Sequence, residues 1–389
     1  MSLALLLAFG STACVQENET PRPGAPGRPG TPAPSLRAVD RTDIVSDQAD
    51  AVTTDPLLVN AWGLAFNPIG AAWISATETG VSVVYDANGQ ELIPAVVIPG
   101  SELATTPGSP TGQVYNPYET AFLGDELIFV TEGGTISGWH ESGGALARLR
   151  VDASAAGANY KGVTIVNTGN VDPRLFAANF AAGTVDVFDA SYMPIATSGS
   201  FKDPSIPPEF SPFNVQNIDG NVAVAYALPD EEGDDVPGPG NGYVDLFDTD
   251  GNLISQLLSG GELDSPWGMT MTPSDFGDMP GRLLVGNFGD GMIHVYRLDT
   301  GSQPPTALLE GTLDDRDGNP IVIDGLWALE LGVDVGGFSS KTLYFTAGPD
   351  DESHGLFGRL EAVATGAASG EQPSTPYTPP APSSPSPGY

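Results

Sequence analysis

A glycine followed by an alternating apolar strand recurs six times along this chain of 389 residues. The copies read GVSVVYD, GTISGWH, GTVDVFD, GYVDLFD, GMIHVYR and GLFGRLE, and they begin at Gly80, Gly134, Gly183, Gly242, Gly291 and Gly355. Apolar residues at every second position are typical of a strand with one buried face. Successive glycines lie 54, 49, 59, 49 and 64 residues apart, so the repeating unit is about fifty residues long.

Two further candidate strands precede each glycine. The first members begin at Ala61, Pro110, Tyr160, Pro212, Pro266 and Gly325, and their partners at Ala71, Glu126, Arg174, Asn221, Arg282 and Thr342. A fourth strand follows in some copies, as at Glu91 and Thr306. Short strands in this number, without a helical period, predict an all-β fold: a six-bladed β-propeller with four antiparallel strands per blade. Because no fourth strand follows Gly355, we expect residues 36–46 to complete the last blade and close the ring.

The two ends of the chain read as non-globular. Residues 1–14 contain a short apolar run before Cys14, the only cysteine, and resemble a bacterial lipoprotein signal lipidated at Cys14; an ordinary secretory signal is the alternative. Residues 15–36 form a Pro/Gly-rich tether and residues 364–389 a Pro/Ser-rich disordered tail, which leaves 37–363 for the propeller. We therefore expect an extracytoplasmic monomer that is either secreted or held by its lipid at the outer membrane or cell surface.

Acidic residues outnumber basic ones by 49 to 14, which gives a formal net charge of -35. Such a surface repels nucleic acid, so nucleic acid is excluded as a partner. The excess of carboxylates suits either a well-solvated surface or the binding of cations.

In a propeller, the turns between the second and third strands share one face with the connections into the innermost strands. On this channel face we expect Glu78, Glu132, Asn179, Asn287, Asp290, Asp350 and His354 from the turns, and Asn60, Lys161, Asn214 and Asp324 from the connections. Oxygen ligands from Glu78, Glu132, Asp290 and Asp350 would suit Ca²⁺, while solvated turn residues are the alternative. Trp62, Trp267 and Trp327 lie near the start of innermost strands, where they serve either as core or as stacking surfaces for a ligand.

The histidines and common catalytic motifs narrow the chemistry. The chain has no G-x-S-x-G, P-loop or paired C-x-x-C motif. The repeat alignment places His140 at the far end of a strand and His294 on a side face between blades, which argues against a three-histidine site. His354 alone falls at the rim of the channel, and it is the candidate catalytic base.

Many ordered motifs, among them LVNAWGLAF, EGGTISGWH, SPFNVQNI, LLVGNFGDG and LYFTAGPDDESHGLFG, resemble a family of exported bacterial β-propellers. More distantly the chain is similar to NHL-repeat propellers and to the streptogramin lyase and gluconolactonase groups. The resemblance spans about residues 45–360 and implies the propeller fold, but no established activity. His140 departs from the family pattern, in which a residue such as Asn is expected.

Three functions from different classes stay open. The first is a binding module whose channel face captures a small molecule, a glycan or an envelope protein. The second is a metal-assisted lactonase or lyase, with His354 as base and Glu78, Glu132 or Asp350 as its partner or metal ligand. The third is a structural envelope protein, in which the acidic segment DEEGDD at 230–235 is only a solvated insertion.

Overall fold

The structure is a computed structural model, and it describes residues 38–101, 106–167, 169, 172–276 and 279–363. In these residues every regular element is a β-strand, apart from three short 3-10 turns at Phe122–Gly124, Glu141–Gly143 and Ser154–Ala156. The predicted signal, tether and tail, including Cys14, lie outside the described residues.

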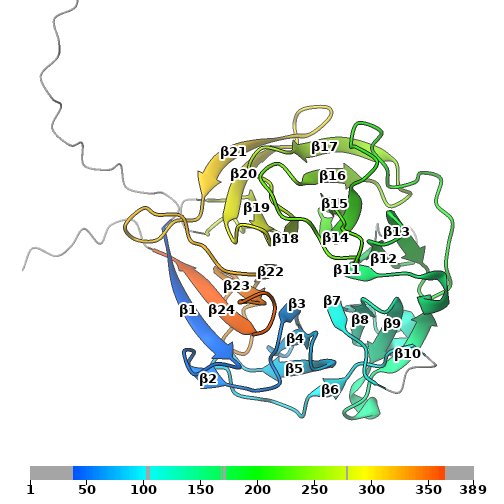
Figure 1. Cartoon of the computed structure of the whole chain (residues 1–389), viewed down its shortest axis with the longest axis vertical. Coiled ribbons are helices and arrows are strands. Elements are labelled where there is room, and N and C mark those ends of the chain that lie inside the picture. Colours follow the sequence, from blue (N-terminus) through cyan, green and yellow to red (C-terminus); the bar gives the residue numbers. More distant parts are fainter. Residues whose placement is uncertain (1–37, 102–105, 168, 170–171, 277–278, 364–389) are drawn as a thin grey trace, which may run out of the picture. The chain divides into compact units, whose positions relative to one another are not determined.

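Six sheets surround a central axis, as Figure 1 shows, and the prediction of a six-bladed all-β propeller is confirmed. Blade 1 contains β3 (Ala61–Phe66), β4 (Ala72–Ala76), β5 (Val81–Tyr85) and β6 (Val96–Val97). Blade 2 contains β7 (Pro110–Tyr115), β8 (Leu127–Thr131), β9 (Thr135–Trp139) and β10 (Arg148–Asp152), and blade 3 contains β11 (Tyr160–Val166), β12 (Arg174–Asn179) and β13 (Thr184–Phe188). Blade 4 contains β14 (Ser211–Ile218), β15 (Asn221–Ala227), β16 (Tyr243–Phe247) and β17 (Leu253–Ser259). Blade 5 contains β18 (Pro266–Met271), β19 (Arg282–Asn287), β20 (Ile293–Asp299) and β21 (Thr306–Thr312).

Blade 6 joins the two ends of the propeller. Its strands β22 (Leu326–Leu331), β23 (Thr342–Ala347) and β24 (Leu356–Ala362) come from the end of the chain, and β1 (Val39–Ser46) pairs antiparallel with β24. The two-residue strand β2 (Thr53–Thr54) adds a parallel edge to β1. The N-terminal segment therefore closes the ring as the sequence predicts, and it covers an edge that could otherwise pair with another chain.

Two outer strands are shorter than the repeat predicts. The strand expected from Glu91 is reduced to Val96–Val97 and a single bridge at Glu91, because Pro94 cannot donate a ladder hydrogen bond. In blade 3, a bridge between Phe188 and Pro194 takes the place of the outer strand, so the described part of this blade has three strands.

Glycines allow the innermost strands to pack directly against each other around the axis. A β-carbon on Gly112 would lie 2.8 Å from the α-carbon of Gly162, and one on Gly63 would overlap the carbonyl oxygen of Thr111. No other residue fits such a close approach of backbones. Beyond this inner ring, buried side chains fill the spaces between neighbouring blades.

The residues just before these close approaches form a second ring at the start of the innermost strands. In blade order they are Trp62, Thr111, Lys161, Phe213, Trp267 and Trp327. Five of them are apolar or small, and one is a lysine. This lysine, Lys161, is the centre of the candidate functional site.

Candidate functional site: a buried lysine at the channel mouth

Three tryptophans fill the central channel at the end where the innermost strands begin, which we call the channel mouth. Trp62 stacks on Trp327 with ring centroids 3.6 Å apart, and Trp267 packs edge-on against both rings. Phe288 stacks on Trp327 at 4.0 Å and is only partly buried. Because the three tryptophans are buried, the structure uses their rings as core.

Lys161 enters this aromatic environment from β11. Its side chain is 1% exposed, and its Nζ lies 5.1 Å from the ring centroid of Trp62. The ammonium donates a 2.6 Å hydrogen bond to Oε1 of Glu132, which lies in the turn between β8 and β9. Burial alone would lower the pKa of Lys161, but Glu132 and Asp234 outweigh it, so the pKa is raised and the lysine stays charged.

The long acidic loop of blade 4 supplies the second partner of this lysine. Asp234 Oδ1 lies 3.3 Å from Lys161 Nζ, although the aspartate side chain is itself 67% exposed. The neighbouring Asp235 is half-buried, and burial raises its pKa to about 6 against the opposing effects of Ser265 and Lys161. The segment 230–235 thus packs onto the channel mouth, and its carboxylates take part in the polar network.

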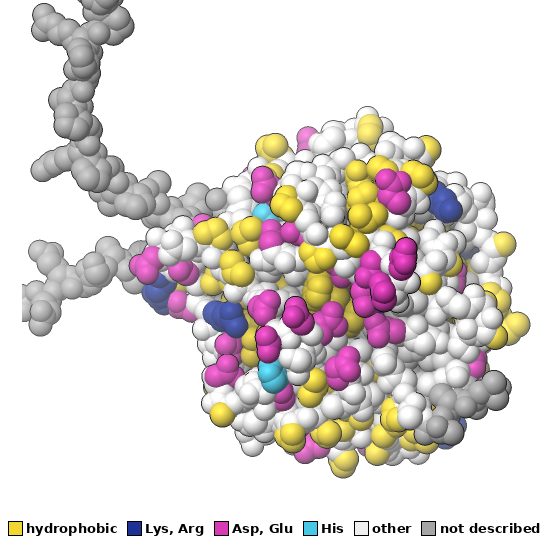
Figure 2. Space-filling model, viewed as in Figure 1, with side chains coloured by type: hydrophobic (Ala, Val, Ile, Leu, Met, Phe, Trp, Pro, Cys, Tyr) yellow, Lys and Arg dark blue, Asp and Glu magenta, His cyan; other side chains and the backbone are white. Residues whose placement is uncertain are grey.

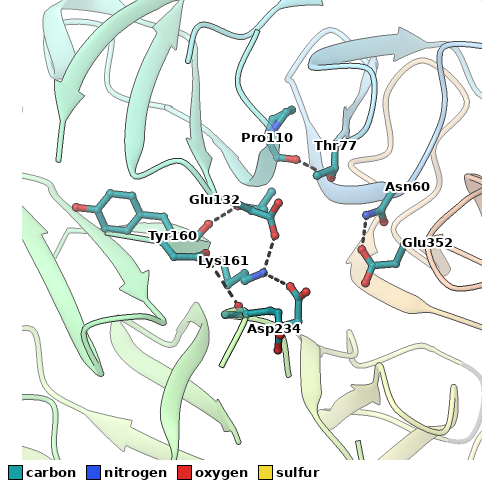
Figure 3. Close-up of polar contacts among 12 residues, drawn as sticks. Asn60, Thr77, Pro110, Glu132, Tyr160, Lys161, Asp234 and Glu352 are labelled. Carbon is teal, nitrogen blue, oxygen red and sulfur yellow. Dashed lines mark hydrogen bonds and ion pairs between the residues drawn. The ribbon is translucent and has the colours of Figure 1, made fainter. Parts of the chain in front are cut away.

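A second polar pair lies beside this group. The amide nitrogen of Asn60 donates a 2.5 Å hydrogen bond to Oε2 of Glu352, and its side-chain oxygen accepts a 3.0 Å bond from the indole of Trp327. Burial raises the pKa of Glu352 to about 7, and Lys161 and Asn60 oppose that rise. Figure 3 shows Lys161 between Glu132 and Asp234, with the pair of Asn60 and Glu352 beside them.

Two residues near the mouth have positive φ angles, and several buried polar atoms there have no hydrogen-bond partner. Asn60 and Ser265, which precede innermost strands in blades 1 and 5, have φ of 49° and 47°, values that non-glycine residues adopt at a cost. Among the described residues, the indole nitrogens of Trp62 and Trp267 and the side-chain oxygen of Asn287 are buried without a hydrogen-bond partner. Such groups are rare in native proteins, and these three atoms lie near the mouth.

The other predicted residues of this face are spread around it. Glu78 and Asp350 are exposed, Asp290 accepts a hydrogen bond from the backbone of Met292, and Asn179 is held by the backbone of its own blade. Within the described part of the chain, no three His, Cys, Asp or Glu side chains converge as a metal site requires. The structure therefore does not bring Glu78, Glu132, Asp290 and Asp350 together as ligands of one ion.

His354 is turned toward the N-terminal strand. Its Nδ1 lies 2.8 Å from Oδ2 of Asp47 and 2.8 Å from Nε2 of Gln48, just beyond the end of β1. Asp350 lies 3.9 Å from its Nε2, and His354 forms no hydrogen bond or ion pair with Glu78 or Glu132. The carboxylate of Asp47 contacts the His354 ring and accepts a hydrogen bond from the backbone N–H of Gly355, so it links the closing strand to the last turn.

The other two histidines do not belong to the group of residues around Lys161. His140 is exposed, and its Nδ1 accepts a hydrogen bond from the backbone of Ser142. His294 is buried on the side of blade 5 near Tyr296, and burial lowers its pKa. Both lie where the alignment of the repeats places them.

Figure 2 shows Asp and Glu side chains gathered around the centre of the face viewed in Figure 1, with hydrophobic side chains between them. Sequence reasoning placed Asn60 and Lys161 on the channel face but assigned them no function, and it considered Asp234 only within the acidic segment 230–235, which one of three open alternatives took as a solvated insertion. The signal available was positional: Lys161 aligns with Trp62, Trp267 and Trp327, so a charged residue there has to be buried.

The described residues contain no helix long and apolar enough to cross a bilayer. No family model matches the chain. Two proteins of Acanthamoeba polyphaga mimivirus, uncharacterized proteins R648 and L690, are 28% and 29% identical to it; they cover 82% and 80% of this chain, and the alignments span 78% and 82% of their own lengths. Both are viral, so membership of an exported bacterial family stays a prediction.

Among solved structures, a Bacteroides thetaiotaomicron protein of unknown function is similar, with a TM-score of 0.51 and 10% identity over 83% of this chain and 76% of its own. Virginiamycin B lyase from Staphylococcus aureus covers 84% of this chain and 99% of its own, with a TM-score of 0.46 and 11% identity. At these identities the likeness concerns the fold alone. Fold and site together define a six-bladed β-propeller with a buried cation at one mouth of its channel.

Proposed function

We propose that this propeller is a binding module, and that its channel mouth around Lys161 binds a polyhydroxylated ligand such as a glycan. The observation that carries the proposal is the buried ammonium of Lys161 held between Glu132 and Asp234. A buried ion pair contributes little to stability compared with well-packed apolar residues, and Trp62, Trp267 and Trp327 fill aligned positions of the ring. A cost of this kind is typical of functional sites.

The chemistry of the mouth favours a ligand rich in hydrogen-bond donors. Glu132, Asp234, Asp235 and Glu352 present carboxyl oxygens, whereas Lys161 is the one cation in their network. Sugar hydroxyls donate to carboxylates, and the partly buried ring of Phe288 offers an apolar surface beside them. The unpartnered indole nitrogens of Trp62 and Trp267 add donors at the base of the same mouth.

A glycan array tests this proposal with the full chain. We expect the wild-type protein to retain a subset of glycans, and the variants Asp234→Asn and Glu352→Gln to lose at least about tenfold in affinity for them. Glu209→Gln removes one exposed charge that takes no part in the hydrogen bonds around Lys161, and it serves as the matched control. Either an empty array or retained glycans that bind both mouth variants normally would refute the assignment.

We further propose that the module is exported and held at a membrane by a lipid on Cys14. The support is the sequence of residues 1–14 and the Pro/Gly-rich stretch that follows it. Labelling with a radioactive fatty acid in a bacterial host tests it: wild type should be labelled and Cys14→Ser should not. Absence of label from the wild-type chain would leave a secretory signal, or none, as the explanation.

A further inference from the structure

The opposite end of the central channel contains a cavity. The innermost strands begin at the mouth around Lys161, and their last residues, among them Phe66 of β3 and Tyr115 of β7, line a cavity of about 470 Å³. Four or five residues of strand separate the two ends, which corresponds to roughly 13–17 Å. The aromatic residues that seal the first mouth lie between them.

This cavity has the size and lining of a small-molecule site. Volumes of about 300–1,000 Å³ are usual for such sites, which combine apolar walls with a few polar groups. Phe66, Tyr115 and Tyr118 supply aromatic surface, and Gln216 supplies an amide. A narrower space of about 40 Å³, lined in part by Trp267 and Met269, continues from it along the channel.

Glu330 is the one charged side chain among the described residues that line the cavity. It lies near the end of β22, and neither Lys, Arg nor His accompanies it in the lining. Burial raises its pKa to about 7, while the amide of Gln216 acts in the opposite direction. A carboxylate held in a channel without a cation costs free energy that a positively charged ligand would recover.

We infer that this second mouth binds a small organic cation, with Glu330 as the counter-ion of its ammonium group and Tyr115 and Tyr118 beside its apolar body. Aromatic rings attract cations through their negative faces, and the formal charge of -35 concentrates cations near the surface. Glu330 thereby differs from Glu132 and Asp234, whose charge Lys161 already balances.

Calorimetry with 2-phenylethylamine tests the inference, and 2-phenylethanol is the matched neutral probe. Wild-type protein should bind the amine at least about tenfold more tightly than the alcohol, and Glu330→Gln should remove that preference. Glu209→Gln, which changes the net charge equally, should leave amine binding unchanged. So should Lys161→Met, because it alters the other mouth.

Three outcomes would overturn the inference. They are no heat with the amine at millimolar concentration, equal binding of amine and alcohol by wild type, and amine binding that survives Glu330→Gln. Circular dichroism and a melting curve establish that Glu330→Gln is folded. The glycan test above uses the other mouth, so either result stands without the other.

Discussion

The two ends of the central channel bury charge in opposite ways. At one end the ammonium of Lys161 is surrounded by Glu132 and Asp234 and is balanced within the protein. At the other end Glu330 lies in an open cavity whose described lining holds no cation. A balanced charge depends on its partners for its stability, whereas an unbalanced one can be neutralised by a proton or a ligand.

The largest expected effect comes from removing a partner of the balanced charge. Glu132→Gln leaves the fully buried ammonium of Lys161 with a charged hydrogen-bond partner, Asp234, that is mostly exposed. We expect the free energy of unfolding to fall by about 3 kcal/mol, as measured by urea denaturation. Asp234→Asn is the control and should cost less than about 1 kcal/mol, because its charge is solvated. Equal losses in the two variants would contradict this ranking.

Blades 3 and 4 have an aspartate at the same strand position, Asp186 and Asp245, and only the first has hydrogen-bond partners. Asp186 accepts hydrogen bonds from Tyr160, Asn179 and Thr184. Asp245 is fully buried, and neither of its carboxyl oxygens has a hydrogen-bond partner among the described residues. Burial, with a smaller effect from Asp203, raises the pKa of Asp245 from 3.8 to about 8.

This difference predicts a pH dependence of stability. Because the folded state holds the proton of Asp245 more tightly than the unfolded state, stability is fully present below pH 3.8, falls as pH rises towards 8, and stays low above it. We expect Asp245→Asn to stabilise the protein by roughly 2 kcal/mol at pH 8, but not at pH 4. Asp186→Asn should lower stability instead. Urea curves at both pH values test this, and parallel behaviour of the two variants would count against it.

Glu330 should show a weaker form of the same effect. Its pKa of about 7 lies above the ordinary 4.5, so its contribution to stability is lost between those two pH values as pH rises. Since the side chain is only partly buried, Glu330→Gln should stabilise the protein by about 1 kcal/mol at pH 8. A variant less stable than wild type at pH 8 would show that the carboxylate has a partner in the fold.

The smallest effect is expected for Lys161→Met. Methionine places an apolar group beside Trp62 in place of the ammonium, and it releases Glu132 and Asp234, which retain access to water. Stability should change by less than about 1 kcal/mol, because replacing a buried charge of an ion pair removes its desolvation cost. Differential scanning calorimetry measures this directly. A loss as large as that of Glu132→Gln would show that the lysine holds the mouth together.

The repeat fixed most of the fold in advance, because period-2 strands and turn glycines are local properties of the chain. The six copies could be predicted from the spacing of the glycines, and closure by the N-terminal strand Val39–Ser46 from the lack of a fourth strand after Gly355. The outer strands of blades 1 and 3 were predicted less well: Pro94 interrupts the first ladder, and the second is reduced to a bridge between Phe188 and Pro194.

The site was predicted less well than the fold. The sequence placed Glu132 and Lys161 on the same face. It gave no reason to pair Lys161 with Glu132, 29 positions before it, or with Asp234, 73 positions after it. His354 likewise was expected to face the channel, whereas its ring contacts Asp47, at a separation of 307 residues.

By itself, the sequence determined the number of blades, their order and the face on which the polar turns gather, because each depends on a repeated local pattern. Only the tertiary structure decided which charges meet. The blades converge on one axis, so the turns of some repeats come within hydrogen-bonding distance of the innermost strand of another. As a result, the buried cation Lys161 has carboxylate partners, whereas the described lining of the cavity around Glu330 contains no cation.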